Sequence, residues 1–455
     1  MKVLVVGTGY VGLTTGVALA WLGHSVTCLD IDESKIAMLQ EGRCPIFEPG
    51  LPELLTLSRE NIHFTTSYEK VDFKSCDVVF IAVGTPSLPD GSCDLGQVRA
   101  AAEPIGERLD EHFTVVVNKS TVPIGSGNWV GSLVREAYNR RNGSNPQGTY
   151  AVASNPEFLR QGAAVYDTLY PERIVIGADD ERAIDLLTNL YRPLLNQAFS
   201  APAFLPRKEG LSAVPLVTCD LASAEMIKYA ANAFLAVKIS FANEMAQLTA
   251  RVGADILQVT QGIGLDSRIG PRFLQAGIGW GGSCFGKDTA ALLATSREYG
   301  LTMPIVEAAR EVNYRQRTWV VDTLLKELKI LKGRSITLLG IAFKANTDDL
   351  RDAPSLDIAR QLIRQGARLT ATDPVALDNA RRYYPDLGVI YCPEPLEALK
   401  GADAAVLITE WPEYARLNWA EIKPILNNAL ILDGRNFLDR HELLRLGYHY
   451  IGVGR

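Results

Sequence analysis

The chain has 455 residues, of which 47% are hydrophobic and 22% charged, and it carries a formal net charge of −6. A chain of this length exceeds what one hydrophobic core serves, so two or three domains are expected. The charge is mild and no dense basic run occurs, which argues against a nucleic-acid partner. The apolar runs are far shorter than a membrane span, so no membrane association is expected either.

The N-terminus and the cysteines indicate a cytoplasmic protein. The sequence opens MKVLVVG, which already reads as a strand and leaves no room for the charged and apolar regions of a signal peptide. The cysteines form an odd, scattered set without a CxxC pair, which predicts reduced thiols rather than disulfides or a zinc site. No metal ion is therefore expected. The set consists of Cys28, Cys44, Cys76, Cys93, Cys219, Cys284 and Cys392.

The first 200 residues are expected to form one α/β domain. Helical patterns separate the first of several short apolar runs, and strands that are buried on both faces are typical of a parallel sheet. A loop rich in Pro, Ala and Ser follows at 200–215. The predicted strands are 3–6, 25–30, 78–83, 114–119, 150–154 and 173–177.

The rest of the chain predicts a helical middle region and a second α/β domain. Apolar residues recur at helical spacing from 222 to about 252, which indicates a long connecting helix with a core-facing stripe. The expected fold is α/β, with two Rossmann-like parallel-sheet domains at 1–200 and 329–455, joined by this central helix and a helical middle region at 217–328. In the second domain, strands are predicted at 335–339, 368–372, 404–408 and 430–433, and a helix at 358–363.

Gly7, Gly9 and Gly12 form a GxGxxG motif directly after the first predicted strand. The string alone is a weak signal, and a structural tight turn is the alternative. Its context strengthens it, because the motif opens a helix and Asp30 ends the next strand, where a carboxylate accepts hydrogen bonds from an adenosine ribose. The glycines let the backbone approach a pyrophosphate at the helix N-terminus. A dinucleotide cofactor is therefore expected.

Asp30 also indicates which dinucleotide is bound. A 2′-phosphate about 4 Å from its carboxylate would meet a repulsion of ~1 to 4 kcal/mol. NAD is thus favoured over NADP, although the charge of nearby Lys35 would soften the preference.

The segment GWGGSCFGKD at 279–288 places a thiol, an amine and a carboxylate where a glycine-rich loop is expected to become a helix. In that helix Cys284, Lys287 and Asp288 share the first turn. An unperturbed cysteine has a pKa of about 8.5, which a helix N-terminus or a cation would lower to ~7 and which Asp288 would raise. No histidine lies in the segment, so lysine, a carboxylate or water must carry proton transfer. The alternative is that Cys284 is a small buried apolar residue.

Specific motifs recur along nearly the whole chain. They are GTGYVG at 7–12, FEPGL at 47–51, VGTP at 83–86, KSTVP at 119–123, NPEFL at 155–159, AEMIKYAANAF at 224–234, the Cys284 segment and GIAFK at 340–344. Together these motifs resemble the UDP-glucose and GDP-mannose dehydrogenase family, and within it the UDP-glucose 6-dehydrogenases. The resemblance implies oxidation of the sugar C6 alcohol of UDP-glucose to a carboxylate with two NAD, through an aldehyde held by the enzyme.

The same resemblance implies roles for individual residues. Cys284 attacks the aldehyde, while Lys228 and Asn232 stabilise the negative oxygen. Asp288 assists proton transfer, and Glu157 and Thr121 lie near the hydrolytic water and the nicotinamide. The implied NAD contacts are Gly7, Gly9, Tyr10, Val11, Gly12, Asp30, Lys35, Thr85, Thr121, Lys287 and Arg351. The implied nucleotide-sugar contacts are Glu157, Phe158, Leu159, Lys228, Asn232, Arg268, Phe273, Gly281, Phe343, Lys344 and Arg435.

The chain departs from the family pattern at Trp280, where Phe is usual, at Gly286, where Pro or Gln is usual, and in the long loop 200–215. These departures bear on the shape of the sugar pocket.

The pair Cys284–Phe285 resembles the pair found in UDP-glucose enzymes more than the Cys-Leu pair of GDP-mannose enzymes. GDP-mannose and UDP-N-acetylhexosamines remain alternative substrates, and the chain could also be a two-electron hydroxyacid dehydrogenase or a non-catalytic NAD-binding regulator.

The central helix is expected to pack against its twin in a homodimer.

Overall fold

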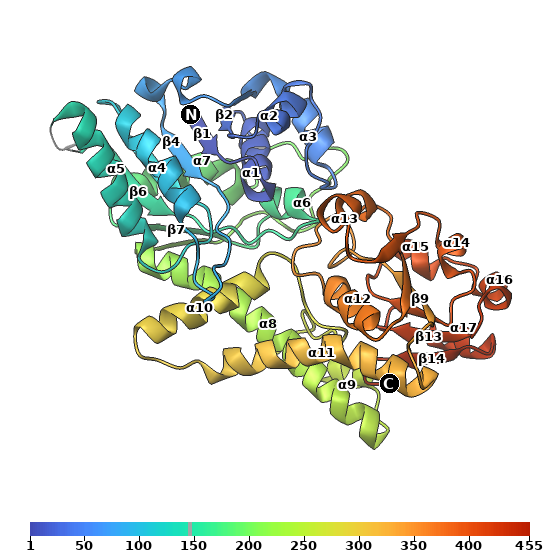
Figure 1. The fold of residues 1–455 in the computed structure, drawn as a ribbon. Coiled ribbons are helices and arrows are strands. Elements are labelled where there is room, and N and C mark those ends of the chain that lie inside the picture. The colour runs from blue at the N-terminus through green and yellow to red at the C-terminus, as the bar shows by residue number, and fades with distance from the viewer. Residues whose placement is uncertain (144–147) are drawn as a thin grey trace. The chain divides into compact units, whose positions relative to one another are not determined.

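The computed structural model describes residues 1–143 and 148–455. The described chain divides into two compact units, whose boundaries fall within the helix α8 (Leu221–Val252), within the helix α10 (Phe285–Glu298) and just after α10. Each unit contains one sheet (Figure 1). The first unit comprises Met1–Ala230 and Ala290–Tyr299, and the second comprises Ala231–Thr289 and Gly300–Arg455.

The sheet of the first unit has the strand order β3-β2-β1-β4-β5-β6-β7-β8. The order reverses between β1 and β4, and in open α/β sheets ligands bind beyond the carboxyl ends of the strands at such a switch point. The strands are β1 (Lys2–Val6), β2 (Ser25–Leu29), β3 (Ile62–Thr65), β4 (Val78–Ile81), β5 (Thr114–Asn118), β6 (Tyr150–Ser154), β7 (Ile174–Ala178) and β8 (Leu216–Cys219).

The parallel arrangement expected from the sequence is confirmed for the paired strands of this sheet except β6 and β7, which run antiparallel. The connection between them carries only the six-residue helix α6 (Ala164–Leu169). A parallel neighbour needs a long crossover connection, usually a full helix, whereas an antiparallel one does not.

Alternation along β1 shows why helices cover both faces of this sheet. Val3 and Val5 pack in one core cluster with Leu13 of α1, whereas Leu4 packs in a second cluster with Val98 of α4. Successive strand residues point to opposite faces, so an all-apolar strand requires cover on each side. The other helices of this unit are α1 (Tyr10–Trp21), α2 (Glu33–Gln40), α3 (Leu51–Leu57), α4 (Gly96–Arg108), α5 (Ser126–Asn142) and α7 (Glu181–Leu195).

The sheet of the second unit has the order β11-β10-β9-β12-β13-β14, and its paired strands are parallel. Its order reverses between β9 and β12. Leu338 of β9 belongs to a cluster with Leu356 of α12 (Pro354–Arg364), and Leu339 belongs to a second cluster with Tyr414 of α15 (Pro412–Ala415). The strands are β9 (Ser335–Leu339), β10 (Arg368–Thr372), β11 (Val389–Tyr391), β12 (Ala404–Leu407), β13 (Leu430–Asp433) and β14 (His449–Gly452).

Helices α8, α9, α10 and α11 lie in the region 217–328, which was expected to be helical. The predicted long helix from 222 to about 252 is confirmed as α8. No helix in the described part of the chain is both long and apolar enough to cross a membrane. The helices after α8 are α9 (Ile256–Gly264), α11 (Pro304–Leu328), α12 (Pro354–Arg364), α13 (Leu377–Tyr383), α14 (Pro395–Leu399), α15 (Pro412–Ala415), α16 (Trp419–Ile422) and α17 (Arg440–Arg445).

Candidate active site

The glycine-rich loop after β1 leaves open space at one glycine and none at two others. A Cβ atom on Gly12 would lie 1.9 Å from the carbonyl oxygen of Gly7, and one on Gly7 would lie 2.5 Å from that of Ala82. Apart from Gly9 and its two chain neighbours, no described residue places an atom within 4 Å of the corresponding position on Gly9, which precedes the first turn of α1. Gly9 therefore leaves room for a pyrophosphate at the positive end of the helix dipole, and the loop fits the expected NAD.

Asp30 ties the end of β2 to this loop. Its Oδ2 accepts hydrogen bonds from the main-chain nitrogen and the hydroxyl of Thr8, both over 2.7 Å, and its Oδ1 accepts from the main-chain nitrogen of Asp32 over 3.0 Å. Lys35, by contrast, places its ammonium 3.8 Å from the carboxylate of Asp32. The geometry thus fixes the carboxylate that is expected to meet the ribose, and Lys35 pairs with a neighbouring acid.

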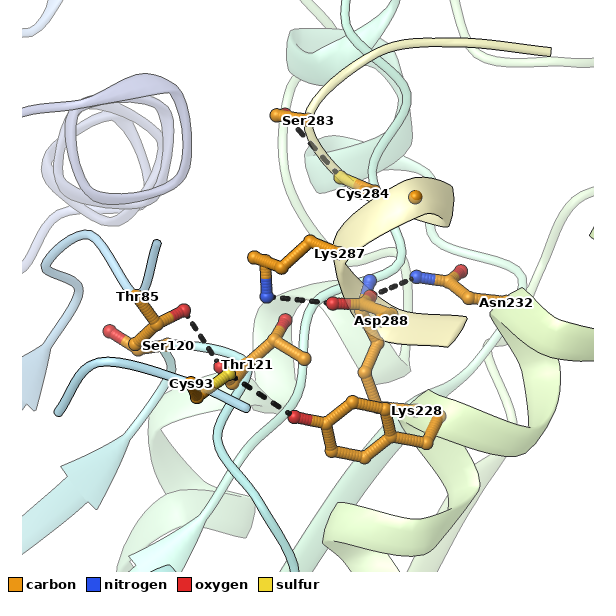
Figure 2. Close-up of polar contacts among 12 residues, drawn as sticks. Thr85, Cys93, Ser120, Thr121, Lys228, Asn232, Ser283, Cys284, Lys287 and Asp288 are labelled. Carbon is orange, nitrogen blue, oxygen red and sulfur yellow. Dashed lines mark hydrogen bonds and ion pairs between the residues drawn. The ribbon is translucent and has the colours of Figure 1, made fainter. Parts of the chain in front are cut away.

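Tyr10 and Val11 begin α1, and Val11 packs against the core. At the ends of β4 and β5, the Thr85 hydroxyl donates to the carbonyl oxygen of Thr121 over 2.9 Å (Figure 2). The hydroxyl of Ser120 donates to the carbonyl oxygen of Val83 over 2.7 Å. These two bonds join the VGTP and KSTVP segments, so the structure brings together Thr85 and Thr121, two of the expected NAD contacts.

Glu157, in the loop after β6, forms a buried ion pair with Lys228 of α8. The ammonium donates to the Glu157 carboxylate over 2.8 Å and to its carbonyl oxygen over 2.7 Å, and the other carboxylate oxygen accepts from the main-chain nitrogen of Leu159 over 2.8 Å. The Lys228 ammonium lies 5.5 Å from the centroid of the Phe158 ring, and the Arg173 guanidinium lies 3.7 Å from the same centroid. The NPEFL segment and Lys228 therefore form one polar cluster in the first unit.

Lys119 is a second buried cation beside this cluster. Its ammonium donates to the side-chain oxygen of Asn155 over 2.9 Å, and the hydroxyl of Tyr191 donates to the same oxygen over 2.6 Å. Burial lowers the pKa of Lys119 to about 8, the charge of Glu157 opposes that shift, and the charge of Lys228 adds to it. Lys119 thus anchors the start of the NPEFL segment and adds positive charge near Glu157 and Lys228.

In the second unit, α10 begins at Phe285, directly after Cys284, so the predicted change from glycine-rich loop to helix is confirmed. The carbonyl oxygen of Cys284 accepts the first helical hydrogen bond, from the main-chain nitrogen of Asp288 over 2.8 Å. The buried Asp288 carboxylate lies 2.7 Å from the Lys287 ammonium and accepts from the Asn232 amide over 2.6 Å (Figure 2). The half-buried Cys284 thiol lies 3.7 Å from the Ser283 hydroxyl, and Cys284 directly precedes the helix whose first turn carries Lys287 and Asp288.

Several residues expected to hold the nucleotide-sugar also meet in the second unit. A Cβ atom on Gly282 would lie 2.8 Å from the ring of Phe343, so the glycine lets the loop reach that ring. The Lys344 ammonium lies 5.6 Å from the ring centroid. The Arg435 guanidinium donates to the carbonyl oxygens of Gly279 and Phe343, each over 3.2 Å. Arg435 therefore joins the Cys284 loop to the GIAFK segment.

Of the four remaining predicted residues, three contact other residues of the second unit and the fourth points to solvent. The ring of Phe273 lies 6.3 Å from that of Phe285, and Gly281 packs against the loop that follows Arg351. Arg351 itself pairs with Asp349 over 2.7 Å. The side chain of Arg268 is 87% exposed and pairs with Asp266, so it points to solvent in this chain.

Three models of one protein family match successive parts of the chain. The model of the UDP-glucose/GDP-mannose dehydrogenase family NAD binding domain matches residues 1–195, that of the central domain matches 222–315, and that of the UDP binding domain matches 337–440. The chain belongs to the UDP-glucose/GDP-mannose dehydrogenase family.

Relatives within the family are similar over nearly their full length. UDP-glucose 6-dehydrogenase TuaD of Bacillus subtilis is 44% identical over 456 residues, which cover 100% of this chain and 93% of the relative. UDP-glucose 6-dehydrogenase of Rhizobium meliloti is 44% identical over 462 residues and all of both chains. The solved structure of a UDP-glucose dehydrogenase from Pyrobaculum islandicum is 38% identical, with a TM-score of 0.88 over 100% of this chain and 97% of that one.

Several residues that contact the predicted site residues were not identified from the sequence. Thr8 lies between the glycines of the GxGxxG motif, and its bond to Asp30 was not predicted. Lys119 received no role of its own within the KSTVP motif, and its position directly after a buried strand was the available signal. Arg173 gave no usable signal, because its partner Phe158 lies in a separate motif.

Proposed function

We propose that this protein oxidises UDP-glucose to UDP-glucuronate with two NAD for each sugar. Its similarity to UDP-glucose 6-dehydrogenases of two bacteria supports this substrate. The observation that carries the proposal is Cys284 at the start of α10, with the Asn232 amide and the Lys287 ammonium both held on Asp288. A thiol is needed for a four-electron oxidation through a covalent aldehyde adduct and has no part in a simple two-electron one.

When bound, NAD accepts one hydride in each of the two oxidations. In the first, the C6 hydroxyl loses its proton and the carbon loses the hydride, which leaves an aldehyde. Lys228 and Asn232, one turn apart on α8, stabilise the negative charge that develops on the oxygen. The loop Gly7–Gly12, Asp30, Thr85, Lys287 and Arg351 hold the dinucleotide.

In the second oxidation, the Cys284 sulfur bonds to the aldehyde carbon and the carbonyl oxygen gains a proton. Loss of a hydride from that carbon and of the hydroxyl proton leaves a thioester. Water then attacks the thioester carbon, the carbon–sulfur bond breaks, and a carboxylate and the Cys284 thiolate remain. Asp288 and Glu157 are the carboxylates that accept protons, and Thr121 orients the water.

The nucleotide end of the substrate is proposed to bind in the second unit. Arg435 and Lys344 supply cations for the diphosphate, and Phe343 supplies an apolar surface beside them. Phe158 and Leu159 of the NPEFL segment contact the sugar. Arg268, whose exposed side chain pairs with Asp266, is proposed to contact the substrate as well.

We also propose that the protein forms a homodimer through α8. Phe234, Phe241 and Leu248 repeat every seven residues on this helix and are 65%, 46% and 56% exposed. Large apolar side chains on one stripe of a long helix favour packing against a second helix. Light scattering should give twice the chain mass, and Phe241→Glu should lower it; a monomeric wild-type protein would refute the dimer.

The seven cysteines are free thiols, which supports a cytoplasmic location for the reaction, because disulfides are rare in a reducing compartment. Fractionation of cells that express the protein tests this location.

The activity is tested by incubating the purified protein with UDP-glucose and NAD. About two NADH should form for each sugar consumed, and the product should be UDP-glucuronate. One NADH per sugar, with free aldehyde accumulating, would instead favour a two-electron dehydrogenase. Initial rates on GDP-mannose and on UDP-N-acetylhexosamines distinguish the alternative substrates.

A further inference from the structure

The loop before Cys284 is clamped by the buried face of α11. The side-chain oxygen of Asn313 accepts from the main-chain nitrogen of Trp280 over 2.7 Å, and its amide donates to the Trp280 carbonyl oxygen over 3.0 Å. The indole nitrogen of Trp280 donates to the hydroxyl of Ser240 over 3.2 Å, and the side chain is buried. Trp280, one of the departures from the family pattern, therefore anchors the loop and presents no exposed ring to a ligand.

Arg317, one turn after Asn313, connects this loop to a distant segment of the same unit. Its guanidinium donates to the carbonyl oxygen of Trp280 over 3.2 Å and to the carboxylate of Asp352 over 2.9 Å, and it also pairs with Asp357. Only 3% of the Arg317 side chain is exposed. One planar group thus bonds both to the loop that precedes the nucleophile and to the segment beside Arg351.

The loop fits directly against that segment. Cβ atoms on Gly281 and Gly286 would lie 2.3 Å and 2.6 Å from the carbonyl and carboxylate oxygens of Asp352, and the main-chain nitrogen of Gly282 donates to the carbonyl oxygen of Arg351 over 3.1 Å. Asp352 has a φ of 48°, a left-handed conformation that is costly for a residue with a side chain. Gly286, the second departure from the family pattern, leaves the space that the Asp352 carboxylate occupies.

We propose that Arg317, acting through Trp280 and Asp352, is a positioning residue that sets the Cys284 thiol for its attack on the aldehyde. The proposal rests on the function proposed above, in which Cys284 is the nucleophile. A buried ion pair contributes little net stability compared with apolar packing, so stability alone does not account for this cluster. Misplacing a reacting group by about 1 Å costs ~100-fold in rate.

The test compares Arg317→Met and Asp352→Asn with the control Arg334→Met. Arg334 pairs with Asp403 in the same unit over 3.3 Å, before β9 and away from the loop, so its loss controls for the removal of an ion pair. For each variant, the alkylation rate of Cys284 by iodoacetamide is measured without ligands. Oxidation of the C6 aldehyde of UDP-glucose, the affinity for UDP and the melting temperature are measured in parallel.

Both loop variants should keep wild-type UDP affinity and KM within about twofold while kcat for aldehyde oxidation falls at least ~10-fold. Their alkylation rate should change as well, and NADH formed per UDP-glucose should fall toward one. Arg334→Met should match the wild type in all of these. If Arg317→Met does not fold, Asp352→Asn decides the question alone, because it changes one atom of the contact.

Wild-type aldehyde oxidation and alkylation in a folded loop variant would overturn the positioning role. Failure of the wild-type protein to oxidise the aldehyde would instead overturn the proposed function, and the alkylation rates would still report whether Arg317 controls the thiol.

Discussion

The Lys228 ammonium donates to two atoms of Glu157, a carboxylate oxygen at 2.8 Å and the carbonyl oxygen at 2.7 Å. Both residues are buried, at 4% and 8% exposure. Sequence reasoning placed each residue at the substrate separately, whereas the structure makes them one charged pair. Their effects on stability and on turnover can therefore be separated by neutralising one or both charges.

Lys228→Met should destabilise the protein by about 3 to 5 kcal/mol, because it leaves the Glu157 carboxylate buried without its partner charge. The double variant Lys228→Met with Glu157→Gln should recover most of that loss, since neither charge remains, yet its kcat should stay low. Urea unfolding and NADH formation measure the two quantities. A double variant as unstable as the single one would show that packing, and not charge, sets the cost; unchanged kcat in Lys228→Met would exclude the lysine from the chemistry.

The central strands were predictable because their residues are buried on both faces. β4, for example, is buried at each of its four positions and reads as an unbroken apolar run. The edge strands β3, β8, β11 and β14 were not predicted. Only the first and last residues of β3 are buried, and no residue of β8 is buried. These short segments therefore lack the apolar pattern that would distinguish them from loops.

The site was predictable where one motif holds its own partners and was missed where partners are distant in sequence. Cys284, Lys287 and Asp288 lie within five residues, and their helix start was predicted. Asn313 and Arg317 bond to Trp280 from more than thirty residues away. A signal for them exists, because both are polar residues on the buried face of α11, where an apolar residue is expected.

Cys284→Ser should stop the second oxidation while the first continues. No histidine lies in the segment 279–288 to act as a base, and a serine hydroxyl is then a much poorer nucleophile than a thiolate, so aldehyde oxidation should fall ~100-fold or more. NADH formed per UDP-glucose should approach one. Cys392→Ser is the matched control, since Cys392 is also half-buried in the second unit and its thiol donates to the Glu394 carbonyl oxygen over 3.4 Å. Full glucuronate production by Cys284→Ser would exclude the sulfur as the nucleophile.

Lys119 should give the stability of the protein a pH dependence above neutrality. Burial lowers its pKa from 10.5 to about 8 in the folded protein. Between these pH values the unfolded chain binds the proton that the folded protein has released, so the free energy of unfolding should rise with pH. Relative to Lys119→Met, the wild type should gain up to about 3 kcal/mol from pH 8 to pH 10.5. Urea unfolding across this range measures it, and parallel curves for the two proteins would show that Lys119 has no lowered pKa.

The glycine-rich loop after β1 offers a pair of substitutions with opposite expected results. Gly12→Ala should destabilise the fold, because its Cβ atom would lie 1.9 Å from the carbonyl oxygen of Gly7. Gly9→Ala should leave the melting temperature close to that of the wild type, since no described residue other than its chain neighbours places an atom within 4 Å of its Cβ position and its φ of −75° suits alanine. The new methyl group would instead occupy the space where the backbone approaches a pyrophosphate.

Isothermal titration with NAD should therefore show at least ~10-fold weaker binding for Gly9→Ala, a loss of about 1.4 kcal/mol. UDP binding, which we assign to the second unit, serves as the internal control and should be unchanged in the same variant. A folded Gly9→Ala protein that binds NAD like the wild type would show that the pyrophosphate does not approach this glycine. Weakened binding of both ligands would point to a general disturbance of the protein, and the assignment of the loop to NAD would lose its support.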